Sequence, residues 1–521
     1  MASGRLIAAV ILLGSLLSSP AGAEDVTLRS RDGSVEVTGE FLNFDGEFFQ
    51  IRTVHGELMV DASGVICEGA GCPDLNAYVS TVRFSGAADI VLEMMPSLVE
   101  AFAARNGYDH RVIIETPERF IYELGDRPTN QIAARFFFDA TNSSEGLKVL
   151  AGGEADIAVS MREVTPVEIR AAQAARLGDL TSPRQSQTLA LDALVPITGD
   201  RNPVSSLTVS ELVKIMSGEI RNWSELGGED APIDLHMRNR SSGLPIVFER
   251  RLLAQYDLEL SEQVNWHLDS QEMADTVAQQ STAIALASRR ETGNAKVISL
   301  RGNCGFPLDH GNNAVKTDDY PLTAPFYLYF PDRRLPKIAR DFLSYLRTPQ
   351  AQAVIRSLGY VDLSAELTDL DEEGRRLLNA ILKAEDATGL TSLKSMVAEL
   401  GNAGRLSLSF RFDGGISRLD TQSRSAINLM ALALEAGFYD DRELILVGFS
   451  DGRGDAAANL GLARRRAIAV REALFEAAPT ADFSRAKIGV LAMGEAMPIA
   501  CDDEDWGRDL NRRVEIWMRY R

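Results

Sequence analysis

Leu444-Ile445-Leu446-Val447-Gly448-Phe449-Ser450-Asp451-Gly452-Arg453-Gly454 is the stretch that decides the fold of the C-terminal region. Its aliphatic start predicts a buried strand, and the polar and glycine residues after it predict a turn. Helical apolar spacing follows from Asn459 to Phe475. Working outward, the region from Leu406 onward predicts strand, helix, strand, helix and strand, with further elements at Leu406–Phe412, Thr421–Ala436 and Arg513–Met518.

A series of landmarks surrounds this stretch in a fixed order. They are the helix start Asn459-Leu460-Gly461-Leu462-Ala463-Arg464-Arg465-Arg466-Ala467, then Gly494-Glu495, Pro498 and Asn511-Arg512-Arg513-Val514. The series resembles the OmpA-like domain, a family that binds peptidoglycan. The family's Gly-His-Thr-Asp turn has Phe449 and Ser450 in place of His and Thr, and Ala463 stands where the family's helix has Ser.

The resemblance implies binding of the diaminopimelate side chain of peptidoglycan. That group is a zwitterion, so its recognition needs one acidic and one basic side chain together. Asp451 and Arg466 occupy the matching positions, and we expect Asp451 to bind the ammonium and Arg466 to bind the carboxylate in a bidentate pair. We expect Asn459 to position the loop. The alternative is a turn cap at Asp451 and a solvated arginine face, and we adopt that interpretation for Arg464 and Arg465 only.

Asn511 and Arg512 are expected to serve the end of the fold. The same turn also matches the Gly-x-Ser-x-Gly elbow of Ser hydrolases. That family needs a later His, and the last His of this chain is His310, so we expect no enzyme here.

The middle of the chain, residues 79–363, alternates strands with helices. This alternation predicts an α/β sheet with helices on both faces. The expected strands are Val82–Gly86, Ala155–Ser160, Leu189–Ile197 and Phe326–Phe330, and an expected helix is Ile90–Arg105.

Several motifs of this region resemble the phosphate-binding (type II substrate-binding) proteins of ABC transporters, which have a two-lobed periplasmic-binding-protein fold. They are Ser85-Gly86-Ala87-Ala88-Asp89-Ile90, Gly153-Glu154-Ala155-Asp156 through Ser160-Met161-Arg162, Asn202-Pro203, Ile215 through Trp223, Arg238 with Ser242-Gly243, and Gly359-Tyr360-Val361.

Anion binding in such a cleft uses helix N-termini with a charged partner. The expected oxyanion-binding residues are Gly86, Ala88, Asp89, Ser160, Arg162, Arg238, Ser242 and Gly243. Three positions depart from the family: Asp89 stands where relatives have Thr, Leu244 replaces the Thr of Ser-Gly-Thr, and Met161 replaces an Asp. A carboxylate at Asp89 would repel phosphate. Three outcomes stay open: an oxyanion ligand, another small ligand, or a cleft kept without a ligand.

Two further segments are expected. Residues 24–78 alternate around turn signals and predict a small β domain, in which Cys67 and Cys72 form a disulfide in an oxidising compartment. Cys304 and Cys501 either bridge two domains or are buried singly. Residues 364–400 predict a helical linker whose apolar stripe packs on a domain: Leu377, Leu378, Ile381 and Leu382.

Export is predicted from the start of the chain. Arg5, the apolar run Leu6–Leu17 and the small residues before Glu24 predict a signal peptide over residues 1–23, cleaved after Ala23. The net charge of −20 argues against nucleic-acid and peripheral membrane binding. No later segment predicts a membrane span, and the five His show no metal-ligand spacing, so no metal or cofactor is expected.

The predicted fold class is multidomain α/β: a small N-terminal β module, a two-lobed periplasmic-binding-protein fold, and a C-terminal OmpA-like α/β sandwich at residues 401–521. The predicted function is a non-enzymatic, wall-associated periplasmic protein that binds peptidoglycan and, in the middle domain, phosphate or a similar anion. An ABC transporter or an envelope protein is the expected further partner. The alternative is an envelope structural or adaptor protein with a vestigial cleft.

Overall fold

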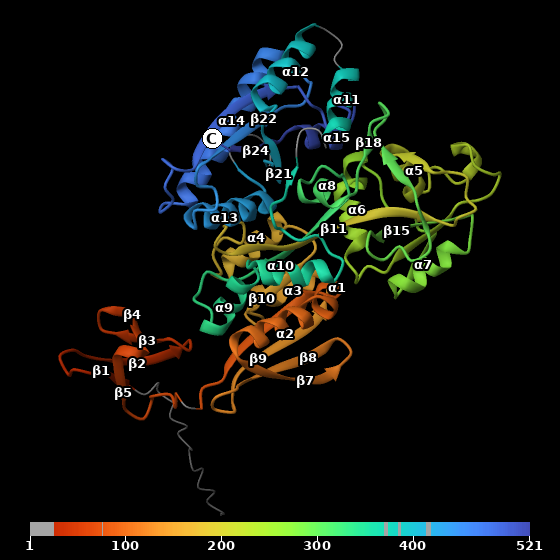
Figure 1. Ribbon diagram of the computed structural model, residues 1–521. Helices are drawn as coiled ribbons and strands as arrows, with labels where there is room; N and C mark the ends of the chain where they lie inside the picture. The colour runs from red at the N-terminus through yellow and green to blue at the C-terminus, as the bar shows by residue number, and fades with distance from the viewer. Residues whose placement is uncertain (1–24, 76, 369–372, 384–386, 413–417, 521) are drawn as a thin grey trace, which may run out of the picture. The chain divides into compact units, whose positions relative to one another are not determined.

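The computed structural model describes residues 25–520 except 76, 369–372, 384–386 and 413–417 (Figure 1). The expected signal peptide lies outside the described residues. The chain divides into two compact units: one reaches to Ser80 and includes Pro336–Ile338, and the other comprises Thr81–Leu335 and Ala339–Arg521. No helix in the described part of the chain is both long and apolar enough to cross a membrane.

The first unit contains an antiparallel sheet of order β4-β3-β2-β1-β5. Alternating side chains such as Val26, Leu28, Phe49 and Ile51 form its core, as the period-2 pattern predicts. The structure joins Cys67 to Cys72 by a disulfide. The strands are β1 (Asp25–Ser30), β2 (Glu36–Phe44), β3 (Phe48–Thr53), β4 (Gly56–Asp61) and β5 (Val65–Glu68).

The second unit begins with a mixed sheet of order β14-β13-β15-β11-β19-β10-β6-β9-β8-β7, with β16 paired to β11. The long strands β11 and β19 connect a first lobe, which carries β6–β10 and α1–α4, to a second lobe, which carries β13–β15 and α5–α8. A small sheet, β12-β17-β18, belongs to the second lobe. The strands are β6 (Ser80–Ala87), β7 (Tyr108–Thr116), β8 (Arg119–Asp126), β9 (Gln131–Thr141), β10 (Ile157–Ser160), β11 (Ser186–Thr198), β12 (Ser206–Thr208), β13 (Asp234–Arg238), β14 (Val264–His267), β15 (Ala283–Ser288), β16 (Lys296–Val297), β17 (Ser299–Arg301), β18 (Pro307–Leu308) and β19 (Thr323–Tyr329).

Helices cover this sheet in both lobes (Figure 1). They are α1 (Ala88–Glu93), α2 (Met95–Asn106), α3 (Ser143–Ala151), α4 (Pro166–Ala174), α5 (Val209–Ser217), α6 (Leu244–Arg251), α7 (Ser270–Ala278), α8 (Asn312–Lys316), α9 (Lys337–Tyr345) and α10 (Pro349–Ser357). The four expected strands are present. The single helix expected over Ile90–Arg105 is instead two, α1 and α2, because Pro96 cannot donate to the carbonyl of residue 92 and its ring clashes there.

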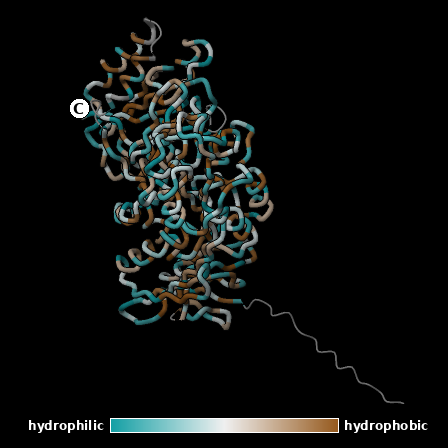
Figure 2. The backbone as a smooth tube through the Cα atoms, turned by 90° about the vertical axis from the view of Figure 1, so that its right-hand side faces the viewer, coloured by the Kyte–Doolittle hydropathy of each residue, from teal (hydrophilic) through white to brown (hydrophobic). Residues whose placement is uncertain are grey.

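The C-terminal part forms a sheet of order β20-β21-β24-β22-β23, in which β22 and β23 are parallel. Helices α13 and α14 bury one face, with a core that includes Leu444, Leu446 and Val470. Figure 2 shows apolar segments running through the interior of the folded chain. The elements are β20 (Leu367–Thr368), α11 (Gly374–Lys383), α12 (Ala387–Leu400), β21 (Gly404–Phe410), α13 (Thr421–Glu435), β22 (Arg442–Phe449), α14 (Ala456–Ala477), β23 (Lys487–Gly494), α15 (Asp505–Asn511) and β24 (Val514–Tyr520).

The segment expected as a linker, residues 364–400, is part of this C-terminal fold. Strand β20 pairs with β21, and α11 and α12 cover the sheet's second face, where Met396 packs against Ile445 and Trp517. Of the expected apolar stripe, Leu377 packs against this core, whereas Leu378, Ile381 and Leu382 are 54%, 47% and 73% exposed. Helix α11 instead buries the smaller Ala380, which allows a close approach to the sheet.

Glycine at position 448 is required by the packing of α14 on β22. A Cβ atom there would lie 2.1 Å from the carbonyl oxygen of Ala463, far inside van der Waals contact. This close approach brings the end of β22 next to the helix. The turn after β22 and the middle of α14 therefore meet.

Candidate functional site

The turn after β22 and helix α14 carry the two predicted peptidoglycan-binding residues. Asp451 follows the strand and is 14% exposed at its side chain, and Arg466 lies on the inner face of α14 and is buried. Arg464 and Arg465, on the same helix, are exposed. The fold therefore separates Arg466 from its two arginine neighbours.

The charge of Arg466 is influenced by both acidic and basic neighbours. The pKa of Arg466 is lowered to about 10, mainly by burial and also by Arg512, whereas Asp451 raises it. The guanidinium also lies over the ring of Phe412, with its Cζ atom 6.0 Å from the centroid. Asp451 and Arg466 thus lie close enough to interact electrostatically.

Arg512, which the sequence assigned to the end of the fold, also lies at the turn. Its Nε lies 3.3 Å from Oδ2 of Asp451, so it faces the same turn. Asn511 does serve the fold: its side chain accepts from the backbone N–H of Ile499 at 2.7 Å and donates to the carbonyl of Ala500 at 2.8 Å. Asn511 therefore stabilises the fold, whereas Arg512 contacts the turn. The Asn-Arg-Arg motif alone could not show which of the two residues reaches the turn.

Asn459 holds the turn in place, as expected of a positioning residue. Its Nδ2 donates to the carbonyl of Arg453 at 2.9 Å and to Oε1 of Glu495 at 2.7 Å. The backbone N–H of Gly452 donates to Asp502 at 3.1 Å, and that of Arg453 donates to Asp451 itself. Side chains from α14, β23 and the loop before α15 therefore fix the conformation of the turn.

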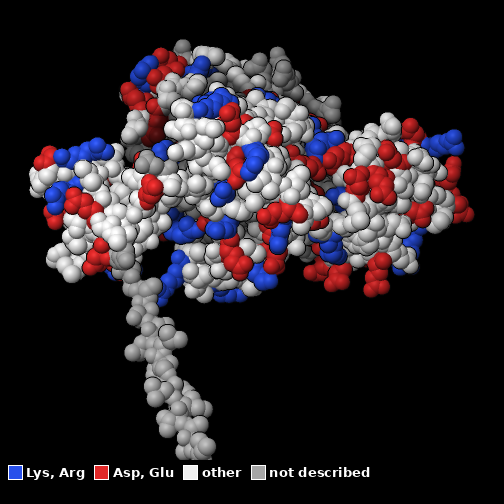
Figure 3. All heavy atoms as spheres, turned by 90° about the horizontal axis from the view of Figure 1, so that it is seen from below, with Lys and Arg blue, Asp and Glu red and all other residues white. Residues whose placement is uncertain are grey.

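A pocket of about 400 Å³ opens beside these residues. We call it the interdomain pocket because Arg466 and Arg512 line it from the C-terminal fold, and Arg251 and Gln255 line it from the second lobe. Figure 3 shows acidic and basic side chains interspersed over the face that it displays. The residues that line the pocket include four arginines and three aspartates, so basic side chains outnumber acidic ones there.

The middle cleft has a different arrangement. Asp89, in the first turn of α1 in the first lobe, lies near Arg238 at the end of β13 in the second lobe, with Oδ1 and Nη2 3.5 Å apart. Burial raises the pKa of Asp89 to about 7, whereas Arg238 lowers it and Glu291 raises it. Oδ2 of Asp89 and Nε and Nη1 of Arg238 are buried without a hydrogen-bond partner in the described part of the chain. A carboxylate of the chain itself thus occupies the side of Arg238 that an anion would need.

Two of the expected oxyanion-binding residues have hydrogen-bond or ion-pair partners within the first lobe. The guanidinium of Arg162 pairs with Glu168 at 2.6 Å and donates to Oγ of Ser144 at 2.7 Å. Oγ of Ser160 donates to the carbonyl of Arg162 at 2.7 Å. Arg162 and Ser160 therefore form a local brace, and the charged group of Arg162 already has an acidic partner.

The remaining expected residues lie where the lobes touch. Gly86 has a φ of +146°, and a Cβ there would meet the carbonyl of Val159 at 1.9 Å. A Cβ on Gly243, the residue before α6, would meet Sδ of Met161 at 2.7 Å. Met161 of the first lobe thus packs against the start of α6 in the second lobe. Ser242 is fully buried beside this contact, and Ala88 opens α1 next to Asp89.

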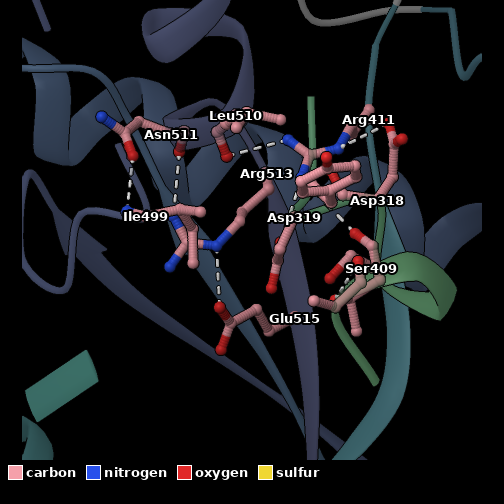
Figure 4. A network of polar contacts seen from close by, with 12 residues as sticks. Asp318, Asp319, Ser409, Arg411, Ile499, Leu510, Asn511, Arg513 and Glu515 are labelled. Carbon is pink, nitrogen blue, oxygen red and sulfur yellow. Dashed lines mark hydrogen bonds and ion pairs between the residues drawn. The ribbon is translucent and has the colours of Figure 1, made fainter. Parts of the chain in front are cut away.

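A buried charge network joins the middle domain to the C-terminal fold (Figure 4). Nη2 of Arg411 donates to the carbonyl of Asp318 at 2.7 Å and to the carboxylate of Asp319 at 3.1 Å, and Arg405 donates to Asp319 at 2.8 Å. Burial pushes the pKa of Asp319 up, but the surrounding guanidinium groups, led by that of Arg405, outweigh burial and hold it below its ordinary value. Each carboxylate of this network has charged partners, so the network holds the middle domain and the C-terminal fold together.

Other chemistry has no support in the described residues. The part of the chain that the structure describes contains no cluster of three or more His, Cys, Asp or Glu that could hold a metal ion. Phe449, where the resembled family has His, is buried with its ring 4.2 Å from Cζ of Arg513. Ser450 is also buried, at 4% exposed.

Comparison with protein families finds two domains. The PBP superfamily domain matches residues 116–350, and the OmpA family matches residues 411–512. The phosphate-binding protein PstS of Borreliella burgdorferi is 23% identical over 238 residues, covering 43% of this chain and 79% of that protein. PstS of Bacillus subtilis is 28% identical over 190 residues, covering 35% and 60%.

For the C-terminal part, the outer-membrane lipoprotein YfiB of Pseudomonas aeruginosa is 35% identical over 105 residues, covering 20% of this chain and 59% of that protein. Among solved structures, an ABC-type phosphate transport receptor from Vibrio cholerae aligns with a TM-score of 0.42 and 22% identity, covering 54% of this chain and 99% of that one. The chain thus spans between 59% and 79% of the length of these curated relatives. It combines a PBP superfamily domain with a C-terminal OmpA family domain, as its motifs predicted.

Proposed function

We propose that this protein is a binding protein of the cell envelope that attaches to peptidoglycan through diaminopimelate. The observation that carries the proposal is that Asp451 lies near enough to Arg466, beside the interdomain pocket, to raise the pKa of its guanidinium. The ammonium of the ligand binds Asp451 and its carboxylate binds Arg466, which is the complementary arrangement for a zwitterion. The protein acts after cleavage behind Ala23, in the periplasm, and without catalysis.

Arg512 adds a condition to this proposal. In the absence of ligand it pairs with Asp451, so binding of the ligand ammonium competes with Arg512 for the same carboxylate. Arg512 can turn from Asp451 to Asp509, with which its Nη2 already forms a hydrogen bond at 2.5 Å. The site therefore exchanges one ion pair for another on binding, which limits the electrostatic cost.

The test is retention on purified sacculi. Asp451→Asn keeps the side-chain shape and removes its charge, and Arg466→Gln replaces the guanidinium by a shorter neutral amide. We expect each to lower retention at least about tenfold, because a buried charge of the ligand then lacks its partner. Arg464→Gln is the matched control, since Arg464 is exposed on the same helix. Undiminished retention of both Asp451→Asn and Arg466→Gln would refute the assignment.

A second function concerns the middle domain. Arg238 has two buried donors, Nε and Nη1, without a hydrogen-bond partner among the described residues, which favours an anionic ligand such as phosphate. The Asp89–Arg238 pair favours the alternative, an adaptor whose cleft is closed by its own carboxylate. Calorimetry with phosphate at low salt separates them. Saturable heat that is lost in Arg238→Gln, but kept in the exposed Arg240→Gln, supports an oxyanion-binding protein that serves an ABC transporter.

A further inference from the structure

The interdomain pocket has two walls from different domains. Arg466 on α14 and Arg512 after α15 form the wall of the OmpA family domain. Arg251, the last residue of α6, and Gln255, in the 3-10 turn Leu253–Tyr256, form the opposite wall. At about 400 Å³ the pocket lies within the ~300–1,000 Å³ range of small-ligand sites, which is more than one amino-acid end group fills.

The pocket wall from the second lobe carries side chains that can bind an anion. Arg251 is held by Asp318, with Nη1 3.2 Å from Oδ1, and this ion pair fixes its guanidinium at the pocket. Gln255 is exposed and donates from Nε2 to the carbonyl of Arg251 at 3.0 Å, so its amide also lies at the opening. The chain carries a net charge of −20, yet this pocket has more arginines than aspartates.

One of the three aspartates has a weakened negative charge. The pKa of Asp420 is raised to about 7, first by burial and also by the carboxylate of Glu163. Near neutral pH a part of the molecules therefore carries a protonated Asp420, and the positive excess in the pocket grows.

The pocket also continues along the domain boundary. A neighbouring pocket of about 250 Å³ shares Arg251, Asp318 and Asp420 with it and extends to Met161 of the first lobe. A ligand that starts at Asp451 and Arg466 therefore has room to pass between the two domains.

We propose that the interdomain pocket is a second anion subsite for the wall peptide, in which a carboxylate next to diaminopimelate in the stem peptide binds between Arg512 and the second-lobe pair Arg251 and Gln255. This inference rests on the proposed function. The stem peptide carries carboxylates on residues adjacent to the diamino acid, and one residue spans only ~3.3–3.6 Å, so such a group falls within reach of a ligand end held at Asp451. The substrate-binding-like domain thereby becomes part of the wall-binding site.

The experiment measures binding of two soluble probes by the full chain: free meso-diaminopimelate, and the tetrapeptide L-Ala–γ-D-Glu–meso-diaminopimelate–D-Ala. Gln255→Glu places a negative charge on the second-lobe wall without disturbing the core, since Gln255 is exposed. Gln263→Glu is the matched control, because it adds the same charge to an exposed position of the same lobe that does not line the pocket.

We expect Gln255→Glu to weaken tetrapeptide binding about tenfold and diaminopimelate binding less than about twofold, because only the longer ligand reaches the second wall. Arg251→Gln, checked for unchanged melting temperature, is expected to show the same selective loss. Tetrapeptide binding by both variants equal to that of Gln263→Glu would overturn the inference and leave the proposed function standing. Failure of the unaltered chain to bind either probe would overturn both.

Discussion

Cys304 of the second lobe is disulfide-bonded to Cys501 of the OmpA family domain, 197 residues further along the chain. Residue 501 lies between Ala500, held by Asn511, and Asp502, whose carboxylate accepts from the backbone of Gly452 beside Asp451. The bond therefore joins the second lobe to the loop that supports the wall-binding turn. The two walls of the interdomain pocket are covalently connected near this point.

Removal of this disulfide is expected to uncouple the domains. A cross-link that closes a 197-residue loop restricts the unfolded chain by about 5 kcal/mol in the chain-entropy model, whereas the Cys67–Cys72 loop accounts for about 2 kcal/mol. In denaturant unfolding we expect Cys304→Ser/Cys501→Ser to lose more free energy of unfolding than Cys67→Ser/Cys72→Ser. We also expect Cys304→Ser/Cys501→Ser to show a separate transition for the C-terminal domain. Equal losses in Cys304→Ser/Cys501→Ser and Cys67→Ser/Cys72→Ser would contradict this.

The buried charge network is expected to make the interface sensitive to acid. Guanidinium groups hold the pKa of Asp319 and of Glu515 below the ordinary values of 3.8 and 4.5. A depressed folded pKa stabilises the protein fully above the unfolded value, and this contribution is lost as the pH falls through the folded value. We therefore expect the contribution of the network, measured as the difference in melting temperature between the unaltered protein and Asp319→Asn, to be constant above pH ~5 and to shrink below pH ~4.5.

Mutation of the same network tests its contribution at neutral pH. Asp319→Asn leaves Arg405 and Arg411 buried with too little negative charge, and we expect a loss of about 3–5 kcal/mol in the free energy of unfolding. Asp441→Asn is the control, because Asp441 is 81% exposed in its pair with Arg485, and such surface pairs contribute about 0–1 kcal/mol. A loss below about 1 kcal/mol for Asp319→Asn would show that the network contributes no more to stability than a surface ion pair.

The sequence was sufficient for the elements whose pattern is local. The aliphatic run Leu444–Val447 predicted β22, and the helical spacing after Asn459 predicted α14. The order of motifs predicted both family domains. The hydrogen-bond and ion-pair partners of individual side chains could not be predicted from such local patterns. Arg162 fits the anion motif, but its partner Glu168 lies in the capping box of α4, a contact that depends on the loop geometry between them.

The interface was also beyond local patterns. Arg405 and Arg411 alternate with apolar residues along β21 as a solvated face would, and only the docking of the middle domain buries them against Asp319. The same holds for the interdomain pocket, since Arg251 and Arg466 are 215 residues apart in the chain. Charge on a strand or a helix indicates a polar surface, and tertiary packing decides whether water or another domain covers it.

The contact of Gly448 with α14 gives a prediction about wall binding. Gly448→Ala places a Cβ 2.1 Å from the carbonyl of Ala463, so α14 must move away from β22 and carry Arg466 with it. We expect weaker retention on sacculi and a loss of about 1–3 kcal/mol, as is usual for overpacking. Gly461→Ala is the control: its Cβ meets only the end of Arg465, and an Ala within the helix stabilises by up to about 1 kcal/mol. Retention of Gly448→Ala equal to that of Gly461→Ala would contradict the close packing.

The Asp89–Arg238 pair predicts how pH controls anion binding in the middle cleft. The pKa of Asp89 is raised to about 7, so its carboxylate loses its charge as the pH falls through neutrality. Protonation removes the repulsion of an incoming oxyanion and frees Arg238 from its internal partner. We therefore expect sulfate, whose charge is constant over this range, to bind about tenfold more tightly at pH 6 than at pH 8.

Asp89→Asn isolates the cause of this pH dependence. The amide cannot ionise, so sulfate affinity should be high at both pH values and the slope between them should vanish. Asp234→Asn is a suitable control because Asp234 begins the same strand β13 that ends at Arg238, and its Oδ2 accepts from Thr282 at 2.7 Å, away from Asp89. If Asp89→Asn kept the slope of the unaltered protein, the pH dependence would arise from another group. If neither protein bound sulfate or phosphate at pH 6, the cleft would be vestigial and the middle domain would act only as a wall of the interdomain pocket.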